Sequence, residues 1–547
     1  MSTTTLLDTL LPARYQRAIT VTFFGLLLAL GLSLVRDYGV SFDEGVQRVS
    51  GQISLFYVFH KLPASLQYKL LPPEAAALIK QKGADRQLSD YGDRDYGVLF
   101  ELPASAAEQV LRIHDKRQIY LLRHTLNYLV CYLGFIAFYV IVARRFGSWR
   151  VGLLGTLLLV LTPRLFADYF YNDKDAVFLA LFTVGIATAV PLIQRPTWRT
   201  ALWHALACAC AVDVRIMGML LPAATLAFVG LRAVRGEYRG QRILGPLGLY
   251  LGLLVGFIVI FWPYLWEQPL AHFTSAWQAM SRFRWPGDVL YQGQLIKGTL
   301  LPWHYSLVWI GLTVPLLYLL FFGVGTAGLL VQVVRRNWRL YASDAEWQDL
   351  LFLGLAVAPL AAVIVLHSVL YNGWRQLYFV YPSLLLVALR GLVAAWHWQP
   401  AGLAAGRYWR PALGLGVGLS LAVIAGRMVR LHPLENMYFN ALAPTQTDRY
   451  YDGDYWGLSY SQGLAWIAQH DARPRIKVFS SLPQPLILNH LIQPAGVQER
   501  LELVYNLVGA DYALTTYFYQ YPPIPTGQPR YTLRAEGLRV LDIYQLR

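Results

Sequence analysis

Long apolar runs alternate with short polar connections along most of the chain, and the first run covers about residues 18–35. An α-helix needs about 20 predominantly apolar residues to cross a bilayer, so runs of this kind are typical of transmembrane helices. The further runs lie at about residues 120–143, 150–163, 175–193, 200–212, 215–233, 243–262, 305–334, 350–370, 376–396 and 411–430. The pattern predicts an α-helical polytopic membrane protein with about eleven transmembrane helices.

The connection after the first run is long and extends over residues 38–119. Residues 46–59 within it place apolar side chains at helical spacing, which predicts an amphipathic helix that lies on the membrane surface. A structured loop without membrane contact is compatible with the same pattern.

The periodicity changes after about residue 470. Short strand-like segments follow there, separated by Pro, Gly and Gln: "RIKVFSSL", "ADYALTTYF", "YTLRAEG" and "LRVLDIYQL". The segment "QERLELVYNLVGA" is predicted to be a helix that ends at Gly509. We therefore expect a membrane module over residues 1–470 and a small α/β soluble domain over residues 471–547.

The composition supports a membrane protein and decides how the net charge is interpreted. Hydrophobic residues make up 56% of the 547 residues and charged residues 14%, against roughly 25% charged in soluble domains. A net charge of +15 is one signature of nucleic-acid binding. The Lys and Arg residues, however, cluster between apolar runs rather than along one face, so we expect the charge to reflect topology and expect no nucleic-acid partner.

Arginine clusters fall on every second connection between the apolar runs. They are Arg14 and Arg17; Arg144, Arg145 and Arg150; Arg195 and Arg199; Arg232, Arg235, Arg239 and Arg242; Arg335, Arg336 and Arg339; and Arg407 and Arg410. The positive-inside rule places these connections in the cytoplasm. The sequence thus predicts a multi-pass protein of the plasma (inner) membrane, with the long first loop and the C-terminal domain outside the cytoplasm.

The three cysteines, Cys131, Cys208 and Cys210, all lie in apolar runs. This placement argues against a disulfide framework and against a closed zinc site, which requires other spacing and polar surroundings. Packing is their expected role.

Two adjacent carboxylates, Asp43 and Glu44, follow the first apolar run in "VSFDEGVQRVSG". Either side chain can cap the helix expected after them. Alternatively, one of them faces a cavity at the membrane edge and takes a proton from a substrate as a general base. A single acidic residue here would suit a solvated interface, but a pair that precedes a helix favours a functional role.

The connection "TPRLFADYFYNDKDAVF" is rich in charge for a turn between two spans. Its polar groups are Arg164, Asp168, Tyr169, Asn172, Asp173, Lys174 and Asp175. Asn172 or Asp173 can cap the following helix. Capping does not account for Arg164, Asp168 and Lys174 together. Arg, Lys and a helix N-terminus directed at one point form an anion site, most simply for phosphate, whereas a carboxylate among them can hold a divalent cation.

A third polar group occurs in "HSVLYNGWRQLYFVYP", where His367 ends one apolar run and Arg375 begins the next. Asn372 and Gly373 predict a tight turn between them. Arg375 lies on the expected outer side, against the positive-inside bias. It is either an interfacial side chain that reaches toward the head groups or a second cation for phosphate. We favour the second role, because neighbouring Trp and Tyr side chains already anchor the interface.

Residues 432–469 are dense in Asp, Asn, Tyr and Trp, and the candidates here are His432, Asp454, Tyr455 and Trp456. Aromatic rings beside amides and carboxylates suit sugars, which present apolar faces and hydroxyl edges. A membrane-interface belt collects the same aromatic residues. The segment "GLSYSQGLAWIAQ" is predicted to be a packed amphipathic helix.

These segments, in this order, resemble the GT-C glycosyltransferases, among them protein O-mannosyltransferases, the lipid A aminoarabinose transferase and a bacterial family 39-like branch. The resemblance extends over about residues 14–469 and is carried by "FDEG", "PRLFADYFYNDKDAVF" and "NGWRQLYFVYP". The segments "HPLENMYFN" and "DYWGLSYSQGLAWI" look like a pattern of the bacterial branch. The implied fold is a GT-C-like helical bundle.

The resemblance implies transfer of a sugar from a polyprenyl phosphate or diphosphate to a hydroxyl of a glycan, lipid or protein acceptor, with inversion. It implies Asp43 as the catalytic base, with Glu44 beside it and an acidic residue of the second outer loop. The catalytic candidates are Asp43, Glu44 and Asp168, and the donor-phosphate candidates are Arg164, Lys174 and Arg375. Substrate or metal candidates are Asn172, Asp173, Asp175, His367, Asn372, His432, Asp454, Tyr455 and Trp456. A divalent cation is an open question.

The alternative is a polytopic transporter or lipid flippase, which would also place charges inside a helical bundle. Asp213 and Arg215, which interrupt an apolar region, favour this alternative. The acidic residues near span ends on one side, together with the lack of a visible internal repeat, favour an enzyme. A scaffold that keeps only the fold is a third possibility.

Overall fold

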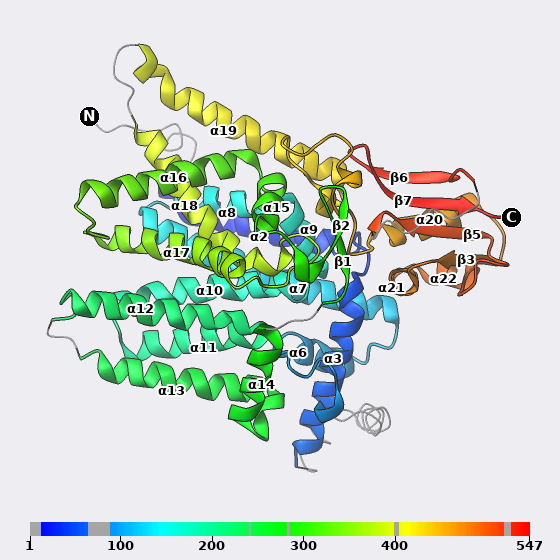
Figure 1. Cartoon of the computed structure of the whole chain (residues 1–547), viewed down its shortest axis with the longest axis horizontal. Helices are drawn as coiled ribbons and strands as arrows, with labels where there is room; N and C mark the ends of the chain where they lie inside the picture. Colours follow the sequence, from blue (N-terminus) through cyan, green and yellow to red (C-terminus); the bar gives the residue numbers. More distant parts are fainter. Residues whose placement is uncertain (1–12, 64–87, 240–241, 282–284, 399–403, 519–526) are drawn as a thin grey trace.

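A computed structural model describes residues 13–63, 88–239, 242–281, 285–398, 404–518 and 527–547. Long helices lie side by side in a bundle, and a five-stranded sheet packs beyond one end of it (Figure 1). The chain therefore has a helical membrane module and a C-terminal α/β region, as the apolar pattern predicts.

Nine helical segments of the described residues are long and apolar enough to cross a membrane. They are α2 Gln16–Leu34, α7 Lys116–Phe146, α10 Asp175–Gln194, Ile216–Val234 (which includes α12 Leu220–Val234), α13 Leu244–Phe261, α16 Leu316–Arg335, α17 Asp344–Val365, Arg375–His397 (which includes α18 Tyr381–His397) and Tyr408–Leu431 within α19 Ala404–Leu431. A tenth span results if α8 Trp149–Val160 and α9 Pro163–Tyr171, bent by 76°, count as one.

The difference from the expected eleven has local causes. α11 Trp198–Val214 has only 17 residues, although it lies within the bundle (Figure 1). The run at residues 150–163 forms α8 with only 12 residues, while the run at residues 305–334 still supplies one span although Pro315 divides it into α15 Tyr305–Thr313 and α16. Pro163 at the start of α9 likewise marks the bend after α8, because proline has no N–H for the preceding turn and suits a first helical position.

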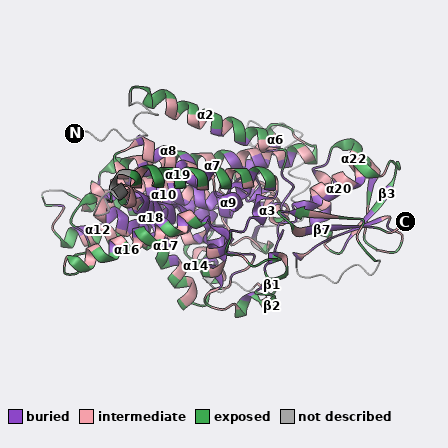
Figure 2. Cartoon of the chain, turned by 90° about the horizontal axis from the view of Figure 1, so that it is seen from above, coloured by how far each residue is buried: buried purple, intermediate pink, exposed green. Residues whose placement is uncertain are grey.

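The two most buried spans are α10 and the segment Arg375–His397, which form the centre of the bundle. α2 lies at its edge and exposes most of its length (Figure 2). An exposed apolar helix suits contact with lipid tails, whereas a buried one is held by its neighbours. Side chains at the first residues of α10 and of Arg375–His397 are therefore set on rigid central elements.

The first long loop forms α3 Phe42–Lys61 and α6 Glu101–Val110, which pack against each other. The helix expected at residues 46–59 is confirmed, and it begins early enough to include Asp43 and Glu44 in its first turn. α3 runs across the ends of the bundle helices on the side of the C-terminal sheet (Figure 1). Another connection on this side contains α14 Pro269–Ser281 and the hairpin of β1 Asp288–Tyr291 and β2 Gln294–Lys297.

The C-terminal sheet has the strand order β4-β3-β5-β7-β6, with β3 parallel to β4 and β5, and β7 antiparallel to β5 and β6. Its elements are α20 Ser459–His470, β3 Ile476–Ser480, α21 Pro483–Leu491, α22 Ala495–Arg500, β4 Leu501–Val504, β5 Tyr512–Thr516, β6 Tyr531–Ala535 and β7 Leu538–Gln545. α20 contributes Tyr460, Leu464 and Ile467 to the core of this sheet.

The four strands expected after residue 470 are confirmed, but the helix expected to end at Gly509 is wrong. Helix α22 ends at Arg500, and the next residues, Leu501–Val504, form the edge strand β4. Leu501 pairs with Ile476 and Leu503 with Val478, so cross-strand pairing decides a segment whose local pattern fits a helix as well.

Candidate active site

Asp43 and Arg375, which lie 332 positions apart in the chain, form an ion pair. The Nη1 atom of Arg375 lies 2.6 Å from Oδ2 of Asp43; the arginine side chain is buried, whereas that of Asp43 is 33% exposed. Asp43 lies in the first turn of α3, and Arg375 is the first residue of the 3-10 helix η6 Arg375–Val380. Two residues that the sequence placed on the same side of the membrane thus meet, and the carboxylate remains accessible.

A second carboxylate joins the same arginine. Asp175, the first residue of α10, is buried, with Oδ2 lying 3.5 Å from Nη1 of Arg375. Asp175 also forms a close ion pair with Arg215, the residue directly after α11. Arg215 was not among the predicted site residues.

Arg215 was considered in the sequence only with Asp213, as a sign of a transport path. In the structure, Asp213 Oδ1 accepts a hydrogen bond of 2.6 Å from the Leu99 backbone N–H and so fixes the first loop, while Arg215 turns to Asp175. The signal that identifies Arg215 is the one used for Arg375: an arginine at the end of an apolar run that the sequence is expected to place outside the cytoplasm.

Lys174 completes the group of cations beside Asp43. Its Nζ atom lies 3.1 Å from the centre of the Tyr96 ring, and none of the described carboxylates lies within ion-pair distance of it. Burial and the neighbouring Arg215 lower the pKa of Lys174 to about 7, although Asp43 and Asp175 oppose this change. Lys174, Arg215 and Arg375 therefore lie around Asp43 and Asp175, and Asp93 also acts electrostatically on Lys174.

Glu44 has a different environment from its neighbour Asp43. Its buried carboxylate accepts a hydrogen bond of 2.6 Å from the Ser41 backbone N–H and lies 2.9 Å from Nε2 of His124. The Ser41 bond is part of a capping box at the start of α3. The capping role that the sequence left open for either residue thus falls to Glu44, while Asp43 faces the cations.

Asn172 and Asp173 support the turn that carries Lys174. The Asn172 side chain accepts a hydrogen bond of 2.7 Å from the backbone N–H of Asp175, so it caps α10. Asp173 lies 3.7 Å from the buried guanidinium of Arg123, which also contacts Glu108 at 3.1 Å. Burial raises the pKa of Asp173 to about 7, and Arg123 opposes that shift. The geometry of both side chains suits positioning of the loop.

Asp168 lies behind Arg375, on the buried helix α9. It interacts electrostatically with Asp175 and Arg375, and the hydroxyls of Tyr171 and Tyr378 also interact with its carboxylate. Within the described part of the chain, no hydrogen bond of normal geometry reaches either of its carboxylate oxygens or Nε1 of the buried Trp456. The Arg375 guanidinium lies 4.5 Å from the Trp456 ring centre. Polar atoms available to a bound ligand therefore gather beside the ion pair.

Arg164 makes its contacts elsewhere in the bundle. Its Nε donates a hydrogen bond of 2.8 Å to the backbone carbonyl of Tyr438, and its guanidinium lies 4.4 Å from the Phe439 ring centre. These contacts connect α9 to the segment after the 3-10 helix η7 Glu435–Met437. Arg164 and Arg375 both interact electrostatically with Tyr455, and Nη2 of Arg164 makes no hydrogen bond of normal geometry within the described residues.

Other predicted residues fix the surrounding loops. Asn372 and Gly373, with φ of 53° and 77°, form the expected tight turn, and the exposed His367 lies before it. Nδ1 of His432 lies 2.8 Å from Oε1 of Glu435, and Nε2 lies 3.1 Å from Oδ2 of Asp37. The histidine side chain thus connects the ends of α19 and α2.

Asp454 acts at the start of α20. Its carboxylate accepts hydrogen bonds from the Ser459 backbone N–H at 2.8 Å and from the Asn436 side chain at 3.1 Å. Tyr455 is buried and interacts electrostatically with Asp168 and Arg164. Asp454 therefore shapes the segment that brings Tyr455 and Trp456 toward the site.

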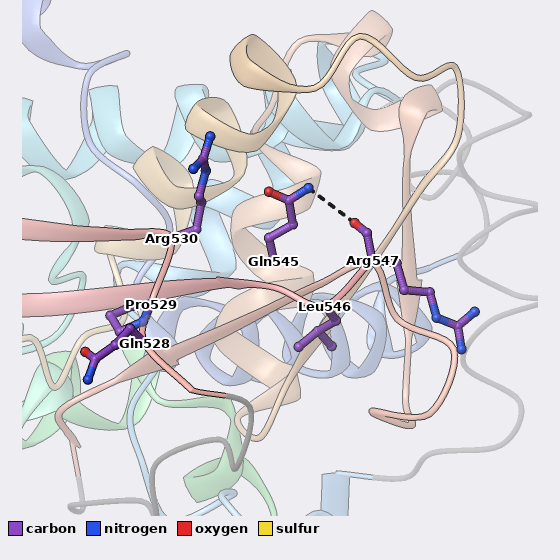
Figure 3. A pocket seen from close by; sticks show the side chains of 6 residues that line it. All are labelled: Gln528, Pro529, Arg530, Gln545, Leu546 and Arg547. Atoms are coloured by element: carbon purple, nitrogen blue, oxygen red, sulfur yellow. Dashed lines mark hydrogen bonds between the residues drawn. The ribbon is translucent and has the colours of Figure 1, made fainter.

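Neither a metal centre nor a second site of comparable chemistry emerges from the described residues. No group of three or more His, Cys, Asp or Glu side chains among them is arranged to hold a metal ion. An open pocket at the edge of the C-terminal sheet is lined by Gln528, Pro529, Arg530, Gln545, Leu546 and Arg547 (Figure 3). These residues include none of the predicted site residues, so this pocket is separate from the Asp43 group.

No protein-family model matches the chain, and no curated protein matches it. Among solved structures it is similar to ArnT from Cupriavidus metallidurans in the apo state, with 13% identity, a TM-score of 0.50 and coverage of 96% of this chain and 98% of that one. The chain has the GT-C fold, as the resemblance in its sequence implied, and it is a multi-pass membrane protein.

Two further solved structures, both with bound ligands, are similar to the chain at lower TM-scores. ArnT from Cupriavidus metallidurans bound to undecaprenyl phosphate has 14% identity, a TM-score of 0.47 and coverage of 96% of this chain and 97% of that one. The oligosaccharyltransferase AglB from Archaeoglobus fulgidus, in complex with an inhibitory peptide and a dolichol-phosphate, has 11% identity, a TM-score of 0.49 and coverage of 91% of this chain and 65% of that one.

Proposed function

We propose that the protein is a membrane glycosyltransferase that moves a sugar from a polyprenyl phosphate or diphosphate to an acceptor hydroxyl at the outer face of the membrane. The observation that carries this proposal is a cluster in which Arg375 pairs with the accessible carboxylate of Asp43, Lys174 interacts electrostatically with the same carboxylate, and Arg215 pairs with the neighbouring Asp175. A cluster of three cations beside an accessible carboxylate suits an anionic donor and a neutral nucleophile.

In the proposed reaction, the acceptor oxygen forms a bond to the anomeric carbon while the bond from that carbon to the phosphate oxygen breaks. Asp43 takes the proton of the acceptor hydroxyl. Arg375 and Lys174 stabilise the negative charge that develops on the leaving phosphate, and a buried pocket strengthens this effect because solvent screening is weak there. A single displacement of this kind inverts the anomeric configuration.

The sugar is proposed to lie between the ion pair and the polar atoms behind it. Trp456 offers an aromatic face next to Arg375, and Asp168 offers two carboxylate oxygens for sugar hydroxyls. The acceptor is a glycan, a lipid or a protein that approaches from the exposed side of Asp43.

We propose that the C-terminal domain and the Asp43 group face outside the cytoplasm in the plasma membrane, because the arginine clusters lie on the opposite connections. The exposed residues Val508, in the C-terminal domain, and Trp338, between α16 and α17, serve as probes. In a background without native cysteines, a membrane-impermeant thiol reagent should label Val508→Cys in intact cells and should label Trp338→Cys only after lysis. The reverse pattern would invert the orientation.

Donor binding should depend on pH through Lys174, whose pKa is about 7. The side chain is protonated below that pH and neutral above it, while a polyprenyl sugar phosphodiester stays ionised. We expect the affinity for this donor to fall by about tenfold, the equivalent of one pKa unit, between about pH 6 and pH 8.5. Titration calorimetry in detergent measures this change.

The variant Lys174→Gln should bind more weakly and show little pH dependence, whereas Lys174→Arg should stay charged throughout. An equal pH dependence in the wild type and in Lys174→Gln would remove Lys174 from the donor site. A lack of any binding of the polyprenyl donor would refute the proposed function.

A further inference from the structure

The C-terminal domain contacts the chain directly before Asp43 through one buried side chain. Asn489, on α21, accepts a hydrogen bond of 2.9 Å from the Val40 backbone N–H and donates one of 3.0 Å to the Val40 carbonyl. It thus satisfies both backbone groups of a residue three positions before Asp43. The Asn489 side chain is fully buried, so no water competes for these bonds.

The same amide also reaches the segment that carries Trp456. Its Nδ2 atom donates to the carbonyl of Gly457 at 2.9 Å, and the Trp456 carbonyl accepts a hydrogen bond of 2.9 Å from the Phe42 backbone N–H. One side chain therefore joins the two backbone segments that present Asp43 and Trp456, both of which contact Arg375.

The packing at this junction leaves little space for movement. A Cβ atom on Gly39 would lie 2.4 Å from Oδ1 of Asn489 and 2.7 Å from the Leu458 carbonyl oxygen. A neighbouring residue of α21, Gln484, donates a further hydrogen bond of 3.0 Å to the Phe42 carbonyl. The start of α3 is thus held from one side by α21 and from the other by the segment after Trp456.

We propose that Asn489 is a positioning residue for the active site, so that the C-terminal domain sets the place of Asp43 opposite Arg375. This inference rests on the proposed glycosyltransferase function. Arg375 and Lys174 belong to the membrane module, where Arg375 also contacts Asp175 and Lys174 lies over the Tyr96 ring. Loss of Asn489 should therefore affect turnover, through Asp43, more than donor binding.

The test compares Asn489→Leu with Gln493→Leu in the full-length protein. Gln493 is a matched control, because it is a buried amide of the same domain whose side chain bonds to Ser461 at 3.0 and 3.1 Å and to the Asn489 carbonyl at 3.2 Å. We expect Asn489→Leu to lower kcat by about tenfold or more with the donor KM within about twofold, as for a misplaced catalytic group. Gln493→Leu should lose about as much thermal stability as Asn489→Leu but keep the wild-type kcat.

Hydrogen–deuterium exchange over residues 38–46 provides a readout that is independent of activity. Exchange of the Val40 and Phe42 amides should increase in Asn489→Leu and stay unchanged in Gln493→Leu. Equal kcat in the two variants, or faster exchange with normal turnover, would overturn the positioning role. A wild-type protein without transfer activity would instead refute the proposed function, and unchanged exchange in Asn489→Leu would separately refute the contact.

Discussion

Replacement of Asp43 by Asn should lower the rate of sugar transfer by about a hundredfold or more, the scale of a lost general base. The amide has nearly the same size but cannot accept the proton of the acceptor hydroxyl. Because Asp43 also neutralises part of the Arg375 charge, its removal should leave donor affinity unchanged or increase it. The expected result is therefore a fall in kcat without a rise in the donor KM, measured in proteoliposomes with a polyprenyl-linked sugar.

Two neighbouring carboxylates serve as controls for this substitution. Asp37→Asn changes an acid at the same exit from the membrane that pairs with His432, and it should leave turnover near the wild-type value. Glu44→Gln alters a buried cap beside His124, so it should lower the free energy of unfolding by about 1–3 kcal/mol and affect turnover less. An inactive Glu44→Gln together with a normal Asp43→Asn would reverse the two roles.

Loss of either Lys174 or Arg375 should depress turnover by about 10²–10³-fold, because each is expected to stabilise charge that forms on the leaving phosphate. Arg375→Lys should not restore full activity. The planar guanidinium of Arg375 contacts both Asp43 and Asp175 and lies over Trp456, which a lysine ammonium group cannot reproduce. Single-turnover rates at saturating donor separate this effect from weaker binding.

Arg390 is a matched control for Arg375, since it lies on the same span and its Nε atom pairs with Asp349 at 2.9 Å. Arg390→Lys should disturb a comparable ion pair away from Asp43 and should reduce stability rather than turnover. Wild-type turnover in both Lys174→Gln and Arg375→Lys, at equal expression, would contradict the electrostatic role of these cations.

The membrane module could be predicted from the sequence because its apolar runs are long and the bilayer fixes their length. The errors occurred where a single proline or a tertiary pairing decides the structure. Pro315 divides one apolar run, and Pro163 marks the bend between α8 and α9. The strand β4 depends on β3, which local sequence does not reveal.

The candidate site could be predicted in part. Asp43, Lys174 and Arg375 are candidates from the sequence because charged residues at the ends of spans expected to face outward are costly unless they have a function, and the structure places the three side chains close together. The separate environments of Asp43 and Glu44 could not be inferred, since His124 approaches Glu44 from another helix. Arg215 was missed because its partner, Asp175, lies 40 positions away rather than beside it.

A cryo-EM structure of the protein in lipid nanodiscs with undecaprenyl phosphate tests the central claim most directly. The account predicts that the phosphate lies between Lys174 and Arg375, within ion-pair distance of both and next to Asp43. A phosphate bound at the opposite end of the bundle, near Arg145 and Arg390, would contradict it.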